Sequence, residues 1–223
     1  MNYSIRKKVV KYYKSKESLL EYLNKLGKTK EITDSDKIQI IGLTNEVWQN
    51  WTHIFRTFWL TYYYGGETLI GKVNRNTISI SNFSAEDDEA TAFMKITKQS
   101  KNMFFYQEKT WGSKDALVKI TNLYPSLGRS NIIASSLSLY GDYLNDFQKI
   151  RNSMVHLTES GFLDLKDHVL SRNYTSPKSY YPHNHPINFF YYKIGVSPNF
   201  VFEDVFEQFD LMLETIFISN PDI

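Results

Sequence analysis

One long stretch of helical periodicity, residues 35–64, constrains the fold most. Its apolar side chains recur every three or four residues, which places them on one face of a helix. Asp34 or Ser35 can cap the start, and Gly65 with Gly66 can end it. We therefore predict a long core helix here, holding three of the four tryptophans. Its apolar positions are Ile38, Ile41, Val47, Trp48, Trp51, Ile54, Phe55, Phe58, Trp59 and Tyr62.

The rest of the chain predicts further helices and little sheet. Apolar and polar residues alternate over 67–83, which predicts a small hairpin or an extended segment. The aromatic segment Phe189–Ile194 is also predicted to be extended. We predict a mainly α fold with a basic helical segment at 1–30 and one helical domain at 31–223. The other expected helices are about 85–98, from Ser113 to Tyr124, about 131–158 after a cap at Ser130, and about 198–218 after Ser197.

Composition narrows the class of protein. The formal net charge is only +2, which argues against a protein coated in nucleic acid but leaves room for a local basic cleft. The sequence has no cysteine, so disulfides and thiolate metal sites are excluded. No apolar run is long enough for a membrane span, and the N-terminus lacks a signal-peptide pattern. We expect a cytoplasmic protein without membrane association.

The predicted helix 131–158 carries a cation where an apolar residue belongs. Arg151 continues one stripe with Ile133, Leu137, Tyr140, Leu144, Phe147 and Met154. An unpaired buried guanidinium is costly, so Arg151 must face a cleft, a carboxylate or a bound anion. A second apolar row would contain Ile132, Leu139, Tyr143, Ile150 and Leu157.

A polar strip on the same helix holds Asn145, Lys149, Asn152 and His156. Lys149 is most simply a solvated lysine. Arg151 and His156 are five residues apart, about 140° on a straight helix, so a groove between helices or subunits explains their cooperation better than one helix does. Arginine grips phosphate and histidine moves protons near neutral pH. In the alternative, Arg151 pairs with a core carboxylate such as Glu46 and His156 bonds a backbone carbonyl.

Two other clusters have simpler explanations than metal binding. His183 and His185 lie in a Pro-rich loop at 176–186 without a third evident ligand, so we read that segment as a surface loop. The acidic residues 86–89 suit the first turn of a helix. We expect no metal and no cofactor.

The segment Arg151-Asn152-Ser153-Met154-Val155-His156 resembles the signature of the HEPN superfamily of all-α domains, which is Arg, four to six residues, then His. The order of the predicted helices is similar as well, with residues 67–83 and 162–196 as departures. The resemblance implies a HEPN-like helical bundle with a small hairpin insertion. It also implies a homodimer in which two motif helices form one cleft.

The function implied by the resemblance is a metal-independent endoribonuclease of a prokaryotic defence or toxin–antitoxin type. Arg151, Asn152 and His156 would be catalytic, with Asn145 and Ser153 in support. The products would carry 2′,3′-cyclic phosphate and 5′-hydroxyl ends. RNA would be the substrate, and an antitoxin could neutralise the protein. Two alternatives stay open: a non-catalytic HEPN-like dimer that binds a nucleotide or partner protein, and an unrelated helical protein in which Arg151 makes a core ion pair.

Overall fold

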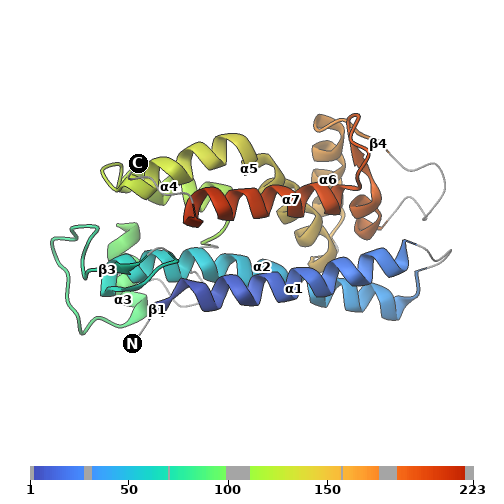
Figure 1. Cartoon of the computed structure of the whole chain (residues 1–223). Coiled ribbons are helices and arrows are strands. Elements are labelled where there is room, and N and C mark those ends of the chain that lie inside the picture. The colour runs from blue at the N-terminus through green and yellow to red at the C-terminus, as the bar shows by residue number, and fades with distance from the viewer. Residues whose placement is uncertain are drawn as a thin grey trace. The chain divides into compact units, whose positions relative to one another are not determined.

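A computed structural model of the chain describes residues 3–27, 32–69, 71–98, 111–156, 158–175 and 185–218. It is mainly α, as predicted (Figure 1). The helices are α1 (Ile5–Leu26), α2 (Asp34–Tyr64), α3 (Glu89–Thr97), α4 (Lys114–Leu123), α5 (Gly128–Val155), α6 (Glu159–Ser171), η2 (Pro186–Tyr191), α7 (Val201–Leu213) and η3 (Glu214–Ile218). The strands are β1 (Tyr3–Ser4), β2 (Gly66–Glu67), β3 (Lys72–Val73), β4 (Tyr174–Thr175) and β5 (Lys193–Ile194). Among the described helices, none is both long and apolar enough to cross a bilayer.

The chain forms two compact units from interleaved segments. The first unit draws on residues 1–12, 50–141 and 212–223, and the second on 13–49 and 142–211. The long helices α1, α2 and α5 therefore contribute one part of their length to each unit.

Aromatic side chains of α2 form the core of the first unit. Trp51 packs edge-on against Phe55 at 5.1 Å between ring centroids, and Phe58 packs similarly on Phe217 at 5.6 Å. The Trp51 Nε1 donates to the carbonyl of Gly112 at 2.9 Å. A Cβ at position 112 would lie only 2.6 Å from the indole ring, so this close approach requires glycine.

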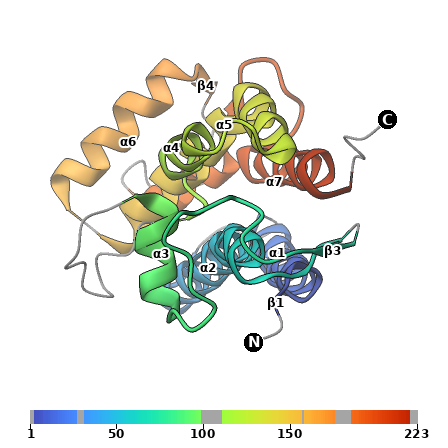
Figure 2. The ribbon, with the colours of Figure 1, turned by 90° about the vertical axis from the view of Figure 1, so that its left-hand side faces the viewer.

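Short strands and α3 complete the first unit. β2 pairs with β3 antiparallel and with β1 parallel, so the predicted hairpin is confirmed for its first part. The helix α3 lies next to α4 (Figure 2). It begins at Glu89, later than predicted, because the Asp88 side chain accepts from the backbone N–H of Thr91 at 2.7 Å and acts as the cap.

Phe147 is the centre of the aromatic core in the second unit. Its ring lies 6.0 Å from Trp48, 5.4 Å from Phe206 and 5.6 Å from Phe209. Phe190 of η2 adds a further ring at 6.1 Å. These contacts fix the middle of α5, and with it the segment that follows Phe147.

Several predicted elements are confirmed. The long helix at 35–64 is α2, and the helix after Ser113 is α4, with the Ser113 hydroxyl accepting from Ala116 N–H at 3.3 Å. The apolar stripe of α5 is also confirmed, with Ile133, Leu144, Phe147 and Met154 buried.

Other boundaries were wrong. α5 begins at Gly128, so Ser130 lies inside the helix and does not cap it. The second apolar row fails at Leu139, which is 67% exposed. Half of the segment predicted as extended at 189–194, residues 189–191, belongs to η2, and only Lys193–Ile194 forms a strand. The His185 side chain caps η2 by accepting from the N–H of Ile187. The closing helix starts at Val201, three residues later than expected.

Candidate functional site

The motif straddles the end of a helix. α5 ends at Val155, so His156 stands one residue beyond it, although its N–H still donates to the carbonyl of Asn152 at 2.8 Å. The predicted helix to residue 158 was therefore too long. Thr158 ends it early because its hydroxyl accepts from the N–H of Gly161 at 3.2 Å and caps the next helix, α6.

Arg151 is half-buried and bonded to two neutral amides. Its Nε donates to Oδ1 of Asn45 on α2 at 2.7 Å, and its Nη1 donates to Oδ1 of Asn152 at 2.8 Å. Within the described part of the chain, no carboxylate pairs with it, and the alternative partner Glu46 is exposed. Burial lowers the pKa of Arg151 from its ordinary value, yet a guanidinium stays protonated at neutral pH. The site therefore holds a positive charge that nothing described there neutralises.

A pocket of about 350 Å³ lies beside the motif. Three of the four residues of the predicted polar strip line it, Lys149, Asn152 and His156, whereas Asn145 is half-buried and does not. The His156 side chain is exposed and bonds no other residue among those described. Arg151 is not part of the lining. Asn152 connects the two, because it both faces the pocket and accepts from Arg151. The other lining residues are Ser153, Thr158, Ser160, Gly161 and Asp164.

Polar contacts between α5 and α6 hold the walls of this pocket together. Ser153 is 4% exposed, and its hydroxyl donates to the carbonyl of Gly161 at 3.0 Å. That bond occupies the hydroxyl's only proton. Lys149 is not simply solvated as we expected, since its Nζ pairs with Asp164 at 2.5 Å.

Further along the same helix pair lies a buried ionic cluster that sequence reasoning missed. The side chain of Asp146 has no exposed surface. Its Oδ1 lies 2.6 Å from Nε2 of His168, and its Oδ2 accepts from Nη2 of Arg172 at 3.1 Å. Burial and the Asp146 carboxylate both raise the pKa of Tyr174. The sequence did offer one sign of this cluster, because Asp146 directly precedes the core residue Phe147. A carboxylate in such a place needs a charged or hydrogen-bonding partner.

The metal-binding alternatives gain no support. His183 lies outside the described residues. His185 has a structural role: its Nδ1 accepts from the N–H of Ile187 at 3.2 Å, and burial lowers its pKa. In the acidic segment, Glu89 pairs with Arg56 at 2.8 Å. No group of three or more His, Cys, Asp or Glu suited to a metal ion occurs in the described ranges.

Comparisons with known proteins do not identify a family for this chain. No family model matches the chain, and neither a curated protein nor a solved structure matches it significantly.

Proposed function

We propose that this protein is a metal-independent endoribonuclease of the HEPN type, and that Arg151, Asn152 and His156 form its catalytic site. The observation that supports this best is the setting of Arg151. Its guanidinium is half-buried and fixed by Asn45 and Asn152, yet paired with no carboxylate among the described residues. A structural arginine would normally be neutralised, whereas one kept for a phosphate needs its charge free.

The proposed reaction is transfer within the RNA chain. A base removes the proton of the 2′-hydroxyl, the 2′-oxygen attacks phosphorus, and the bond from phosphorus to the 5′-oxygen breaks. The 5′-oxygen takes up a proton, leaving 2′,3′-cyclic phosphate and 5′-hydroxyl ends. His156 performs one of the two proton transfers, for which its exposed position beside the pocket suits it. Arg151 holds the phosphate and stabilises its growing charge.

Asn152 links the two groups. It holds Nη1 of Arg151 and lines the pocket with His156, so it would set the position of the cation relative to the proton donor or acceptor. Asn145 and Ser153 are weaker candidates. Asn145 lies off the pocket, and the Ser153 hydroxyl is committed to Gly161.

The partners follow from the same proposal. A homodimer would bring a second copy of the motif to the RNA, and its His156 could supply the other proton transfer. The protein would work in the cytoplasm, in defence or as a toxin, and a neutralising partner would restrain it.

Incubation of the purified protein with mixed RNA in EDTA tests the proposal, beside the variants Arg151→Ala and His156→Ala. Arg6→Ala and His53→Ala are matched controls, because Arg6 and His53 are exposed and lie in the other unit. All variants should melt at the wild-type temperature and elute at the wild-type size.

We expect cleavage with cyclic-phosphate ends by the wild type and both controls, and at least about a hundredfold slower cleavage by the two motif variants. DNA, which lacks the 2′-hydroxyl, should stay intact. Equal cleavage by all five proteins would refute the site. RNA binding that depends on Arg151, without cleavage of any RNA, would favour the non-catalytic binding module.

A further inference from the structure

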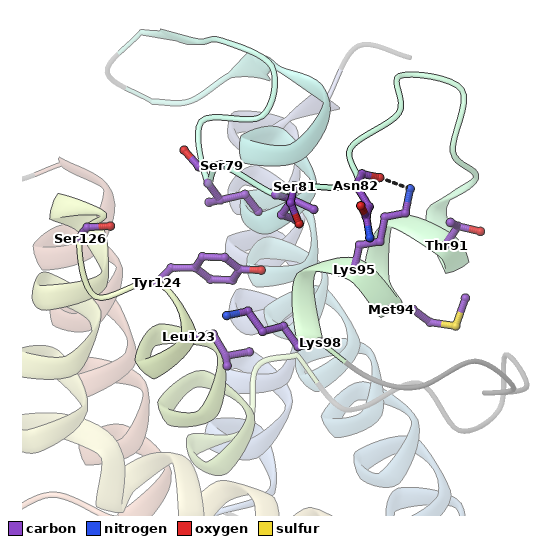
Figure 3. A pocket seen from close by; sticks show the side chains of 12 residues that line it. Ser79, Ser81, Asn82, Thr91, Met94, Lys95, Lys98, Leu123, Tyr124 and Ser126 are labelled. Atoms are coloured by element: carbon purple, nitrogen blue, oxygen red, sulfur yellow. Dashed lines mark hydrogen bonds between the residues drawn. The ribbon is translucent and has the colours of Figure 1, made fainter.

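A second pocket lies in the first unit, and no residue of the motif lines it. Its volume is about 650 Å³, within the range of about 300–1,000 Å³ typical of small-molecule sites. Three parts of the unit form it: the segment 78–82, the helix α3, and the end of α4 with the turn after it (Figure 3). The lining residues are Ile78, Ser79, Ile80, Ser81, Asn82, Thr91, Met94, Lys95, Lys98, Leu123, Tyr124 and Ser126.

The charge of the lining is positive. Two lysines and no carboxylate line the pocket. Lys95 is committed, since its Nζ lies 2.6 Å from Asp87 and 2.5 Å from the carbonyl of Asn82. Lys98 has no acidic partner in the described part of the chain, and its Nζ lies 6.0 Å from the centre of the Tyr124 ring. One ammonium is thus available to an anion.

Serine hydroxyl groups line other parts of the pocket. The side chains of Ser79, Ser81 and Ser126 are exposed and make no hydrogen bond to other described residues. In Figure 3, Ser79 and Ser81 lie on one side of Tyr124 and Lys98 on the other. A phosphate oxygen accepts from the Lys98 ammonium, and the serine hydroxyls can exchange hydrogen bonds with polar groups of an organic ligand.

The apolar part of the pocket is rigid. Tyr124 is 7% exposed, and its hydroxyl donates to the carbonyl of Ile96 at 2.6 Å. Its ring also packs 6.0 Å from that of Trp59. A fixed ring beside half-exposed Leu123 provides a surface for an organic group, which inorganic phosphate would leave bare.

The backbone of Lys98 is fixed by the end of α3. Its φ of 50° is that of a left-handed helix cap, and its N–H donates to the carbonyls of Met94 and Lys95. The helix end therefore sets where the Lys98 side chain leaves the backbone beside the pocket.

We propose that this pocket binds a small organic phosphate of nucleotide size. Lys98 holds the phosphoryl group, and Tyr124, Leu123 and the serine hydroxyls contact the organic part. Binding here is separate from RNA cleavage, because the catalytic residues proposed above belong to the other unit.

Calorimetric titration of the whole protein with AMP tests the proposal, with adenosine and inorganic phosphate as partial ligands. Lys98→Asn removes the charge and keeps a residue that tolerates positive φ. Lys119→Gln, on exposed α4 surface outside the lining, is the matched control. Ser81→Phe blocks the pocket without touching the lysine, and a thermal melt checks each fold.

We expect AMP to bind the wild type and Lys119→Gln equally, within about twofold, and to bind Lys98→Asn and Ser81→Phe at least about tenfold more weakly. Adenosine and phosphate alone should each bind at least about tenfold more weakly than AMP. His156→Ala should bind AMP normally, which separates this proposal from the nuclease. Absence of AMP binding, or equal binding by Lys98→Asn and Lys119→Gln, would overturn it. Phosphate binding as tight as that of AMP would refute the ligand class.

Discussion

The guanidinium of Arg151 is oriented by Asn45, whose Oδ1 accepts from Nε at 2.7 Å across 106 positions of the sequence. The two residues lie on α5 and α2, and both are half-buried. An amide at position 45 orients the cation without neutralising it. That difference from a carboxylate makes the role of Asn45 testable.

Asn45→Asp should slow RNA cleavage by about tenfold or more while leaving the protein at least as stable as the wild type. The new carboxylate would keep the geometry but form an ion pair with Arg151 and compete with phosphate. Single-turnover cleavage rates and thermal melts of the same samples measure both effects. Glu46→Gln, one position along on exposed surface, should change neither. Unaltered cleavage by Asn45→Asp would mean that the charge of Arg151 is not used.

Asp146→Asn should destabilise the protein by about 3 kcal/mol, because it leaves Arg172 and His168 facing a buried amide. Urea unfolding measures the loss. The matched change Asp164→Asn breaks the Lys149 pair on the same helix pair, but Asp164 is 63% exposed, so its cost should stay below about 1 kcal/mol. Equal costs would contradict the assignment of Asp146 as the buried anchor of α6.

Ser153→Ala should cost about 1 kcal/mol in the free energy of unfolding and leave the rate of RNA cleavage within about twofold. The reason is that the Ser153 hydroxyl donates to Gly161 and has no further proton for a substrate. Unfolding curves and cleavage assays on one preparation give both numbers. A large loss of cleavage at unchanged stability would instead make Ser153 part of the chemistry.

Acid should weaken the first unit through Asp87. Burial acts to raise the pKa of this carboxyl, but hydrogen bonds from Lys95 and Tyr63 outweigh it and hold the pKa below the ordinary value of 3.8. The folded state therefore has the lower pKa, so the contribution is complete above that ordinary value and is lost as pH falls through the folded one. Melting temperatures of the wild type should drop between about pH 4 and pH 2 more steeply than those of Asp87→Asn. Parallel curves would refute the role of Asp87.

Periodicity predicted the elements that bury broad apolar faces, and it failed where polar contacts decide. α2 was predictable because its aromatic residues recur at helical spacing and are buried. The helix α6 was not predicted, because polar contacts of Asp146 and Asp164 join it to α5. Such contacts produce no apolar periodicity in the sequence. The end of α5 before His156 depended on the Thr158 cap of α6, which the apolar periodicity did not show. Asn45 could not have been paired with Arg151 from sequence, since no local pattern joins residues so far apart.

The polar contacts of Arg151 and of Lys149, both on α5, differ in their sensitivity to salt. Arg151 is held by hydrogen bonds to uncharged amides in a half-buried setting, and these are insensitive to dissolved salt. The Lys149–Asp164 pair is exposed, and salt screens such pairs. High ionic strength should therefore weaken the Lys149–Asp164 contact between α5 and α6 and leave the hydrogen bonds of Arg151 in place, while buried Asp146 keeps α6 attached to α5.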